Sequence, residues 1–435
     1  MQPRDNVAQG AASGGRAPLS PAPSASGFDP RALEPRTWKD RLSACILERL
    51  LSYPQRLMAI GRFFAPVVRI CMVSWVFVLR YDEVREVLNN SRAFPVDWGG
   101  RMKQVTGGEN FVLGMPPDAE YKLSYKQLAE AFPRKEIKEH VAQPAAQFTE
   151  EFLRGSPREF DAVRDLITAV PTRLCRDYYG LEIADEAVFA RATLAVSSYI
   201  FGPSRNDKST RLALAAAQDL RAVFLAAIDG ARKGTNRGVV VPRMLNDMKL
   251  PDEVIVAQMF GMVLGFIPTN VLAGGNMLET LLRYPDFMLR ARTAALAGDD
   301  DLLWRCLREA LRFRHINPGP WRDCDEGYTF GKGGPREIRI PPGSKVFALT
   351  QSAMFDERRV KRPHVFDPDR DDADYMIFGV GQHWCLGAYM AMAQLTQTFK
   401  PLLRLNNLHA MGNPSVRTVR FNGLFPLHLT VGYDP

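Results

Sequence analysis

The spacing of hydrophobic residues predicts a mostly helical chain. Apolar residues recur with helical period through most of the sequence after Arg80. Asp82 is placed to cap one helix, and Asp118 introduces another that Pro133 ends. Residues 236–248 are interpreted as a basic, exposed connection. Further helices are expected over residues 135–155, 161–178, 184–201, 209–231, 251–282 and 386–399, the last closed by Pro401.

Short alternating stretches bounded by Gly and Pro predict strands near residues 67–79, 338–349 and 427–432. Because strand material comes from both ends of the chain, we expect a mainly α fold with a small β region in a single interlocked domain. Residues 1–37 begin as a run rich in Ala, Ser, Gly and Pro and are expected to be disordered, which leaves 38–435 as the folded domain.

The N-terminal residues contain no apolar block, which argues against a secretory signal. The later apolar stretch from Phe63 to Leu79 is interrupted by Pro66 and Arg69, and it is shorter than the ~20 residues that span a bilayer. We therefore expect a soluble, cytoplasmic protein without a membrane anchor.

Composition is that of an ordinary globular protein, with 46% hydrophobic and 24% charged residues. The net charge of +8 favours an acidic partner. Its Lys and Arg residues are scattered, so we expect no nucleic-acid partner, and the cluster of Arg134, Lys135 and Lys138 is interpreted as a solvated helix face. The six cysteines form no CxxC pair and the six histidines are dispersed, which argues for a reducing compartment and against a zinc site.

The most informative segment surrounds Cys385, directly before the apolar helix expected from Leu386 to Phe399. A helix N-terminus favours a thiolate, because its free amides and partial positive charge face the sulfur. Gly379 and Gly381 allow sharp turns that bring amide donors close. Thiolate character and amide donors are the features that tune an iron-bound sulfur.

The run FGVGQHWCLG, residues 378–387, resembles the heme-binding signature FxxGxHxCxG of the cytochrome P450 family of heme-thiolate monooxygenases. The resemblance covers residues 40–433 and implies the cytochrome P450 fold, heme b as cofactor, and Cys385 as the iron ligand. A thiolate ligand favours cleavage of an O–O bond. The loop residues implied to contact the cofactor are Phe378, Gly379, Gly381, His383 and Gly387.

Three other residues are implied to brace this loop. Glu309 and Arg312 stand three apart on one predicted helix, where they can pair. The same spacing in Glu151 and Arg154 shows that it means little alone. In the family, however, the pair joins a basic residue of a later segment, which matches Arg370 in the run FDPDR.

The resemblance also implies contacts to the heme propionates. Arg322 stands where the family has a propionate-binding arginine, and a planar guanidinium suits a carboxylate. The helix that follows Pro116 departs from the usual Asp-Pro-Pro-Glu-His pattern, and there Tyr121 and Lys126 are the nearest polar candidates. The run FNGLF, residues 421–425, resembles the family's C-terminal hairpin tip.

The distal helix, expected from Val256 to Leu282, departs from the family pattern Ala/Gly-Gly-x-Asp/Glu-Thr, in which the acid and the alcohol organise water for proton delivery. In one register Ile267 takes the acid position and Pro268 the alcohol position; a shift by one residue supplies Thr269 but still no acid. Pro268 distorts the helix by removing a backbone donor. Gly265, Thr269 and Asn270 are the other candidates here, with Asn270 able to orient a hydroperoxide.

The substrate pocket is expected to be apolar, as is usual for small-molecule sites. Its candidate lining residues are Phe94, Trp98, Phe111, Phe266, Ile267, Ile316 and Phe425.

Three functions stay open from the sequence. The first is monooxygenation of a small, largely apolar organic substrate with electrons from a separate, acidic ferredoxin or flavodoxin and its reductase. The second is a peroxygenase or hydroperoxide isomerase, which needs no acid and alcohol pair. The third is a heme-binding scaffold or sensor without turnover.

Overall fold

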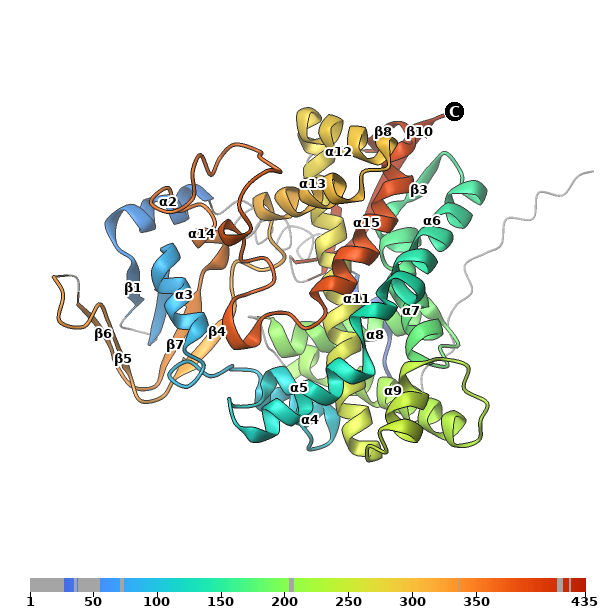
Figure 1. Ribbon diagram of the computed structural model, residues 1–435, viewed down its shortest axis with the longest axis horizontal. Coiled ribbons are helices and arrows are strands. Elements are labelled where there is room, and N and C mark those ends of the chain that lie inside the picture. The colour runs from blue at the N-terminus through green and yellow to red at the C-terminus, as the bar shows by residue number, and fades with distance from the viewer. Residues whose placement is uncertain are drawn as a thin grey trace, which may run out of the picture.

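The computed structural model of the protein describes residues 27–34, 37, 55–70, 74–202, 207–335, 337–412, 418–421 and 424–435. The molecule is a helical body with a smaller sheet-containing region beside it (Figure 1). Its α-helices are α2 (Gln55–Phe64), α3 (Tyr81–Asn89), α4 (Gly99–Thr106), α5 (Ala119–Ala131), α6 (Gln143–Gly155), α7 (Ala169–Leu174), α8 (Glu186–Phe201), α9 (Asp207–Arg232), α10 (Val240–Pro242), α11 (Asp252–Arg283), α12 (Pro285–Ala297), α13 (Asp300–Phe313), α14 (Thr350–Ala353) and α15 (Ala388–Arg404).

The strands are short and form three sheets. One sheet has the order β1-β2-β7-β4, a second has the order β3-β10-β8 with β9 also paired to β10, and the third is the hairpin β5-β6. The strands are β1 (Val67–Ile70), β2 (Trp75–Val78), β3 (Glu159–Asp161), β4 (Trp321–Cys324), β5 (Tyr328–Phe330), β6 (Ile338–Ile340), β7 (Ser344–Ala348), β8 (Asn406–Ala410), β9 (Thr418–Phe421) and β10 (Phe425–Asp434).

These pairings join distant parts of the sequence. Strand β2 runs parallel to β7, and β10 runs antiparallel to β3. The mainly α fold with a small sheet contributed by both ends of the chain is therefore confirmed. Whether the folded domain begins at residue 38 remains a prediction.

Helix α11 forms the centre of the helical body, where it packs against α8, α9, α13, α15 and β10 (Figure 1). It is apolar on nearly all sides, which is the pattern of a helix buried all round. By length and composition it could cross a membrane, but 83% of its most apolar window is buried inside the protein. We therefore assign it as the core helix of the fold.

Helix α13 supplies a more typical amphipathic pattern. The Asp299 side chain accepts a hydrogen bond from the Leu302 amide and so caps its N-terminus. Its buried face includes Glu309 and Arg312, while Asp300 and Asp301 at its start complement the helix dipole. The helix thus carries two charged residues into the protein interior beside the central helix α11.

Several sequence predictions of individual elements are wrong. Residues 236–248 are not an exposed connection. They include α10 and the π-helical turn η7 (Arg243–Asp247), in which the side chains of Val240, Val241 and Met244 are completely buried. Pro401 does not close α15; the helix continues to Arg404, because burial of Leu402 and Leu403 offsets the lost hydrogen bond.

Two further expectations at the N-terminal side need correction. Asp82 lies inside α3 and pairs with Arg359 instead of capping the helix. Within residues 27–34, part of the segment expected to be disordered, Phe28 and Leu33 are buried. Residues 1–26 lie outside the described part of the chain.

Candidate functional site

Cys385 lies in a cavity between α11 and the loop that precedes α15. The cavity measures about 240 Å³. From the Cys385 side it is lined by Phe378, His383, Leu386 and Gly387, and from α11 by Gly261, Met262, Gly265, Phe266, Thr269, Asn270 and Ala273. A sulfur therefore faces the central helix across a largely apolar space.

The backbone of the cysteine loop is shaped by its glycines. Gly379 and Gly381 have positive φ angles of 75° and 72°, which L side chains rarely adopt. The Cys385 amide donates to the Phe378 carbonyl at 2.9 Å, which closes the loop. Gly387 precedes the first residue of α15, so the cysteine stands just before the helix N-terminus.

The Cys385 thiol is enclosed by protein except where it faces the cavity. Burial raises its pKa to about 11, and a hydrogen bond from the Gly387 amide only partly opposes this. Desolvation of the charged sulfur is therefore a larger effect here than the hydrogen bond at the helix start. A metal cation bound to the sulfur would reverse this balance, because coordination deprotonates a thiol.

Glu309 is completely buried and holds the brace of the loop together. Its carboxylate accepts two hydrogen bonds from Arg312, at 2.7 and 2.8 Å, and one from Arg370 at 3.5 Å. The Asp367 amide at 3.1 Å and the Tyr375 hydroxyl at 2.8 Å also donate to it. Burial raises the pKa of Glu309, but the hydrogen bonds and charge of Arg312 more than offset this and lower it overall.

The two guanidinium groups of the brace also bind backbone carbonyls. Arg312 donates to the carbonyls of Met354 and Val365, and Arg370 to those of Lys361, Arg362 and Val365. The brace therefore fixes the segment that runs from residue 354 to residue 375, directly before the cysteine loop. The part that Tyr375 plays in the brace was not predicted from the sequence, although Tyr375 stands three residues before Phe378.

A second cavity of about 210 Å³ adjoins the first and shares His383, Ile316 and Ile377 with it. Arg322 and His315 also line it; Arg322 is buried and His315 is half-buried. Burial lowers the pKa of Arg322 to about 10, and the pKa of His383 is lowered to about 4, first by burial and then by the charge of Arg322. His383 Nδ1 and His315 Nε2 have no hydrogen-bond partner in the described part of the chain.

None of the described residues that line this second cavity is an Asp or a Glu, although the charge of Asp97 partly opposes the lowering of the pKa of Arg322. The Arg322 side chain donates a hydrogen bond to the neighbouring Trp321 carbonyl, at 2.9 Å. Burying a guanidinium beside two unpaired imidazole nitrogens is costly, and an anion bound in this cavity would offset that cost. The sequence reasoning found Arg322 and His383 but missed His315, which no motif marks.

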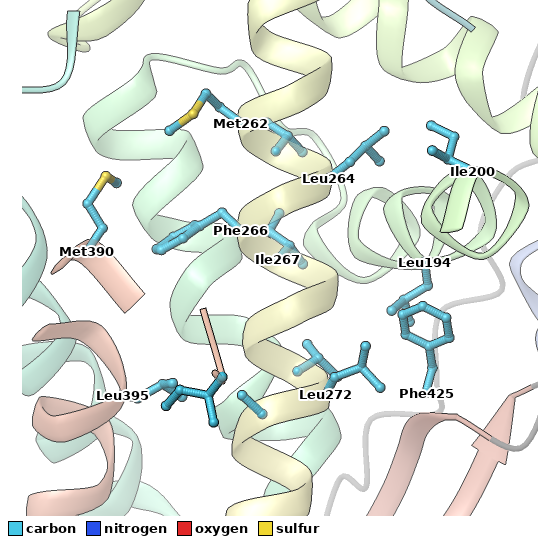
Figure 2. Packing of buried hydrophobic residues seen from close by; sticks show 14 of the residues in the cluster. Leu194, Ile200, Met262, Leu264, Phe266, Ile267, Leu272, Met390, Leu395 and Phe425 are labelled. Carbon is cyan, nitrogen blue, oxygen red and sulfur yellow. The ribbon is translucent and has the colours of Figure 1, made fainter. Parts of the chain in front are cut away.

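Helix α11 turns two different faces to its surroundings. Figure 2 shows Met262 and Phe266 extending towards Met390 of α15, whereas Leu264 extends to the opposite side, towards Ile200 of α8. Gly265 and Thr269 share the cavity face, and the Thr269 hydroxyl donates to the Gly265 carbonyl. Ile267 and Pro268 are buried and do not line the cavity.

This geometry selects one of the two registers for the distal motif. Thr269 takes the alcohol position on the cavity wall, and Pro268 takes the position of the acid. The cavity lining favours this register over the one with Ile267 at the acid position and Pro268 at the alcohol position. No Asp or Glu is found among the described residues that line this cavity.

The structure brings together only some of the predicted pocket residues. Phe111, Phe266 and Ile316 line the cavity, and the Phe111 ring lies against Gly261 of α11. Trp304 of α13 also lines it, stacked on Phe378 with ring centroids 6.2 Å apart, and was missed. Sequence position gave no signal for a residue on that helix.

The other predicted pocket residues lie elsewhere. Phe94 packs against Tyr328 and Phe330, and Trp98 against Phe201. Ile267 belongs to the core, and Phe425 lies at the start of β10 near Leu194, away from the cavity (Figure 2). Of the hairpin tip, Asn422 and Gly423 lie outside the described residues.

The two candidates on α5 also differ in placement. Tyr121 is buried, and its hydroxyl donates to the Gln382 carbonyl at 2.7 Å, so it contacts the cysteine loop. Burial raises its pKa to about 12. Lys126 is exposed and pairs with Glu130, which places it in solvent and not at the cavity.

Comparisons with known proteins agree with this geometry. The family model described as Cytochrome P450 matches residues 240–419. A steroid C26-monooxygenase of Mycobacterium tuberculosis (strain CDC 1551 / Oshkosh) is 28% identical over 312 residues, covering 70% of this chain and 80% of that protein. The chain belongs to the cytochrome P450 family. Cytochrome P450 107B1 of Saccharopolyspora erythraea is 24% identical over 388 residues, covering 82% of this P450 and 89% of that protein.

Solved structures show the same fold. P450BioI in complex with an acyl carrier protein carrying hexadec-9Z-enoic acid has a TM-score of 0.74 and 18% identity, covering 88% of this P450 and 98% of that chain. CYP109E1 from Bacillus megaterium in complex with testosterone has a TM-score of 0.73 and 22% identity, with the same coverage. The cytochrome P450 fold expected from the cysteine loop is confirmed.

As a cytochrome P450, the chain is an oxidoreductase that binds heme b. The residues present fit this group in three respects. A side chain added at Gly265 or Gly387 would meet nothing within 4 Å, so the helix and the loop leave room on both sides of the cavity. The free thiol of Cys385 faces that room, and nitrogen atoms of Arg322, His315 and His383 line the adjoining cavity, where they could bind an anionic group.

Proposed function

We propose that this P450 is a monooxygenase that oxidises a small, largely apolar organic substrate with electrons from a separate redox partner. The observation that carries the proposal is the placement of Thr269 on the cavity wall opposite Cys385, with its hydroxyl bonded to the Gly265 carbonyl. The family pattern has its alcohol at this position. Its oxygen keeps lone pairs that can hold a water molecule in the cavity.

In this proposal each part of the site has a task. Heme supplies a redox-active iron whose thiolate ligand favours O–O cleavage. Cys385 holds the iron, Arg322, His315 and His383 bind the propionates, and Glu309, Arg312 and Arg370 keep the loop in place. Phe111, Phe266 and Ile316 exclude water and receive the apolar substrate. Thr269 positions the water through which protons pass.

An acidic ferredoxin or flavodoxin suits the surface near Cys385. Arg134, Lys135 and Lys138 are exposed, and the Arg134 guanidinium lies over the ring of Tyr389, 3.9 Å from its centroid. Tyr389 belongs to the first turn of α15 and contacts Trp384, next to the cysteine. Positive charge here would speed the encounter with an acidic partner.

The charge arrangement is tested by reversing it. We expect Arg134→Glu combined with Lys135→Glu to slow reduction of the heme by ferredoxin several-fold at low salt, and the difference to vanish at high salt. Lys126→Glu, which reverses the charge at an exposed position of α5, is the control. A wild-type reduction rate in the double variant would contradict the proposed docking surface. We further propose a cytoplasmic location, where such partners occur.

The second candidate is a peroxygenase or hydroperoxide isomerase. It is favoured by Pro268, which occupies the acid position, and by the lack of a carboxylate among the described lining residues of the cavity. A preformed O–O bond reduces the need for that acid.

One comparison separates the two functions. The purified holoprotein is incubated with a medium-chain fatty acid, a terpene and a steroid, either with NADH, reductase and ferredoxin or with hydrogen peroxide. Product in the electron-dependent arm, lowered by Thr269→Val, supports monooxygenation. Product in the peroxide arm alone, unaffected by Thr269→Val, overturns it in favour of the second candidate.

A further inference from the structure

Asn270 is a buried polar residue on the wall of the Cys385 cavity. Only 2% of its surface is exposed, and its Nδ2 atom has no hydrogen-bond partner in the described part of the protein. A buried, unpaired amide costs roughly 1–3 kcal/mol. Asn276, six residues further along α11, shows the usual arrangement, since it accepts from Arg420 at 3.1 Å and donates to the His315 carbonyl at 3.2 Å.

The surroundings of Asn270 provide nothing for its amide to bind. The neighbouring wall is apolar, formed by Phe111, Met262, Phe266 and Ala273. Thr269, the adjacent polar residue, already donates its hydroxyl hydrogen to the Gly265 carbonyl. The Asn270 amide is therefore an unused hydrogen-bond donor on the wall of the space that faces the heme site.

We propose that Asn270 determines substrate specificity by donating a hydrogen bond to a carbonyl oxygen of an otherwise apolar substrate. This rests on the proposed oxidation of a bound organic substrate. An amide donor pairs with a neutral acceptor oxygen, and the oxygen removes the cost of the unpaired N–H. A site built around a buried hydrogen-bonding group discriminates strongly against analogues that lack the partner atom.

The charge of the cavity argues against an acidic substrate group at this place. No Asp, Glu, Lys or Arg is found among the described residues that line the cavity around Asn270. A carboxylate drawn into this space would lose its hydration without gaining a cation. Arg322 lies in the adjoining cavity, where it serves the propionates. The wall therefore fits a substrate with a neutral carbonyl group, such as a ketone.

The test measures binding and needs no electrons. The heme-loaded full chain is titrated with two probe pairs that share a carbon skeleton, cyclododecanone with cyclododecane and 2-adamantanone with adamantane. The readout is the shift of the Soret band on binding. We expect the ketone of at least one pair to bind ten-fold or more tightly than its hydrocarbon. Asn270→Leu should remove this preference and leave the affinity for the hydrocarbon unchanged.

Two further variants complete the design. Asn270→Asp keeps the shape but replaces the donor by an acceptor, so it too should lose the preference for the ketone. Thr269→Val should keep it. Equal affinity for ketone and hydrocarbon in the wild type, including no binding of either, overturns the proposal. So does a preference that survives in Asn270→Leu or in Asn270→Asp, or loss of heme from both variants, which would assign Asn270 to the cofactor pocket.

Failure of this inference is distinguishable from failure of the proposed function. Binding preference does not depend on the oxidant, whereas the comparison of electron-dependent and peroxide-dependent product does. A P450 that forms product with ferredoxin but shows no ketone preference would retain the proposed function and lose only the role of Asn270.

Discussion

Replacing Glu309 by Gln should destabilise the protein strongly. The substitution keeps the shape of the side chain but removes the negative charge between Arg312 and Arg370, both of which are almost fully buried. Removing one partner of a buried ion pair costs about 3–5 kcal/mol, because the remaining charge stays desolvated without compensation. Since whole proteins are stable by only ~5–15 kcal/mol, this loss should be large and easily measured.

The assay is urea denaturation followed by far-UV circular dichroism, with Soret absorbance recorded in parallel. Glu151→Gln is the matched control, since Glu151 and Arg154 share the i, i+3 spacing but are exposed. It should change the free energy of unfolding by no more than about 0.5 kcal/mol. If Glu309→Gln fails to fold, Tyr375→Phe removes one hydrogen bond to the same carboxylate and should cost about 1.5–3 kcal/mol.

The reasoning is refuted if Glu309→Gln unfolds within about 1 kcal/mol of the wild type. If the desolvation argument is right, two buried guanidinium groups without a carboxylate must lower the free energy of unfolding by more than that. A second expected result concerns the loop itself. Soret absorbance should be lost at a lower urea concentration than helical structure, because the brace fixes the segment that precedes Cys385.

Three further outcomes are expected. Cys385→Ser should abolish the red-shifted Soret band that the reduced protein gives with carbon monoxide, and a band unchanged in that variant would rule out the thiolate. Gly265→Leu should lower heme retention without lowering stability of the heme-free protein, since open space faces Gly265; equal heme content would contradict the fit. The pKa of His428 is raised to about 9, first by its hydrogen bonds to Asp161 and Glu34. The stability that protonated His428 contributes is thus fully present below pH ~6.5 and is lost as pH rises through about 9. The free energy of unfolding of the wild type should therefore fall more between pH 6 and 9.5 than that of His428→Gln. Equal decreases in the two proteins would refute this.

The proximal half of the site was accessible from sequence because its residues are tied to a local motif. The glycines, the histidine and Cys385 stand in a short run whose backbone shape depends on those residue types. Glu309 and Arg312 share one helix face, so their pairing follows from helical spacing alone. Arg370 could be matched only through the resemblance, since no local rule connects it with residues sixty positions earlier.

The distal half was less accessible, because it depends on which helix face meets the cavity. A shift by one residue rotates a helix by about 100°, which is enough to exchange Pro268 for Thr269. The pocket residues Phe94, Trp98 and Phe425 were placed by position in loops and at a hairpin, where the packing of distant segments decides orientation. His315 and Trp304 carry no signal of their own type or spacing.

The predictions of secondary structure were wrong where burial in the core overrides the local preference of the sequence. Residues 236–248 contain basic and polar residues, yet Val240, Val241 and Met244 pack into the core. The burial of Leu402 and Leu403 similarly carries α15 past Pro401. Such tertiary contacts are not encoded in the local pattern of either segment.

The parallel pairing of β2 with β7 has a consequence for how the protein is made. About 270 residues separate Val78 from Ser344, so β2 leaves the ribosome long before its partner exists. At the usual ~5–20 residues per second, this interval is roughly 13–54 s. Throughout it, Trp75, Val76 and Phe77 form an apolar strand whose β7-facing edge has no partner, the kind of edge that templates aggregation. We expect nascent chains stalled before residue 344 to expose this edge to chaperones, and full-length chains, in which β7 covers it, to hide it.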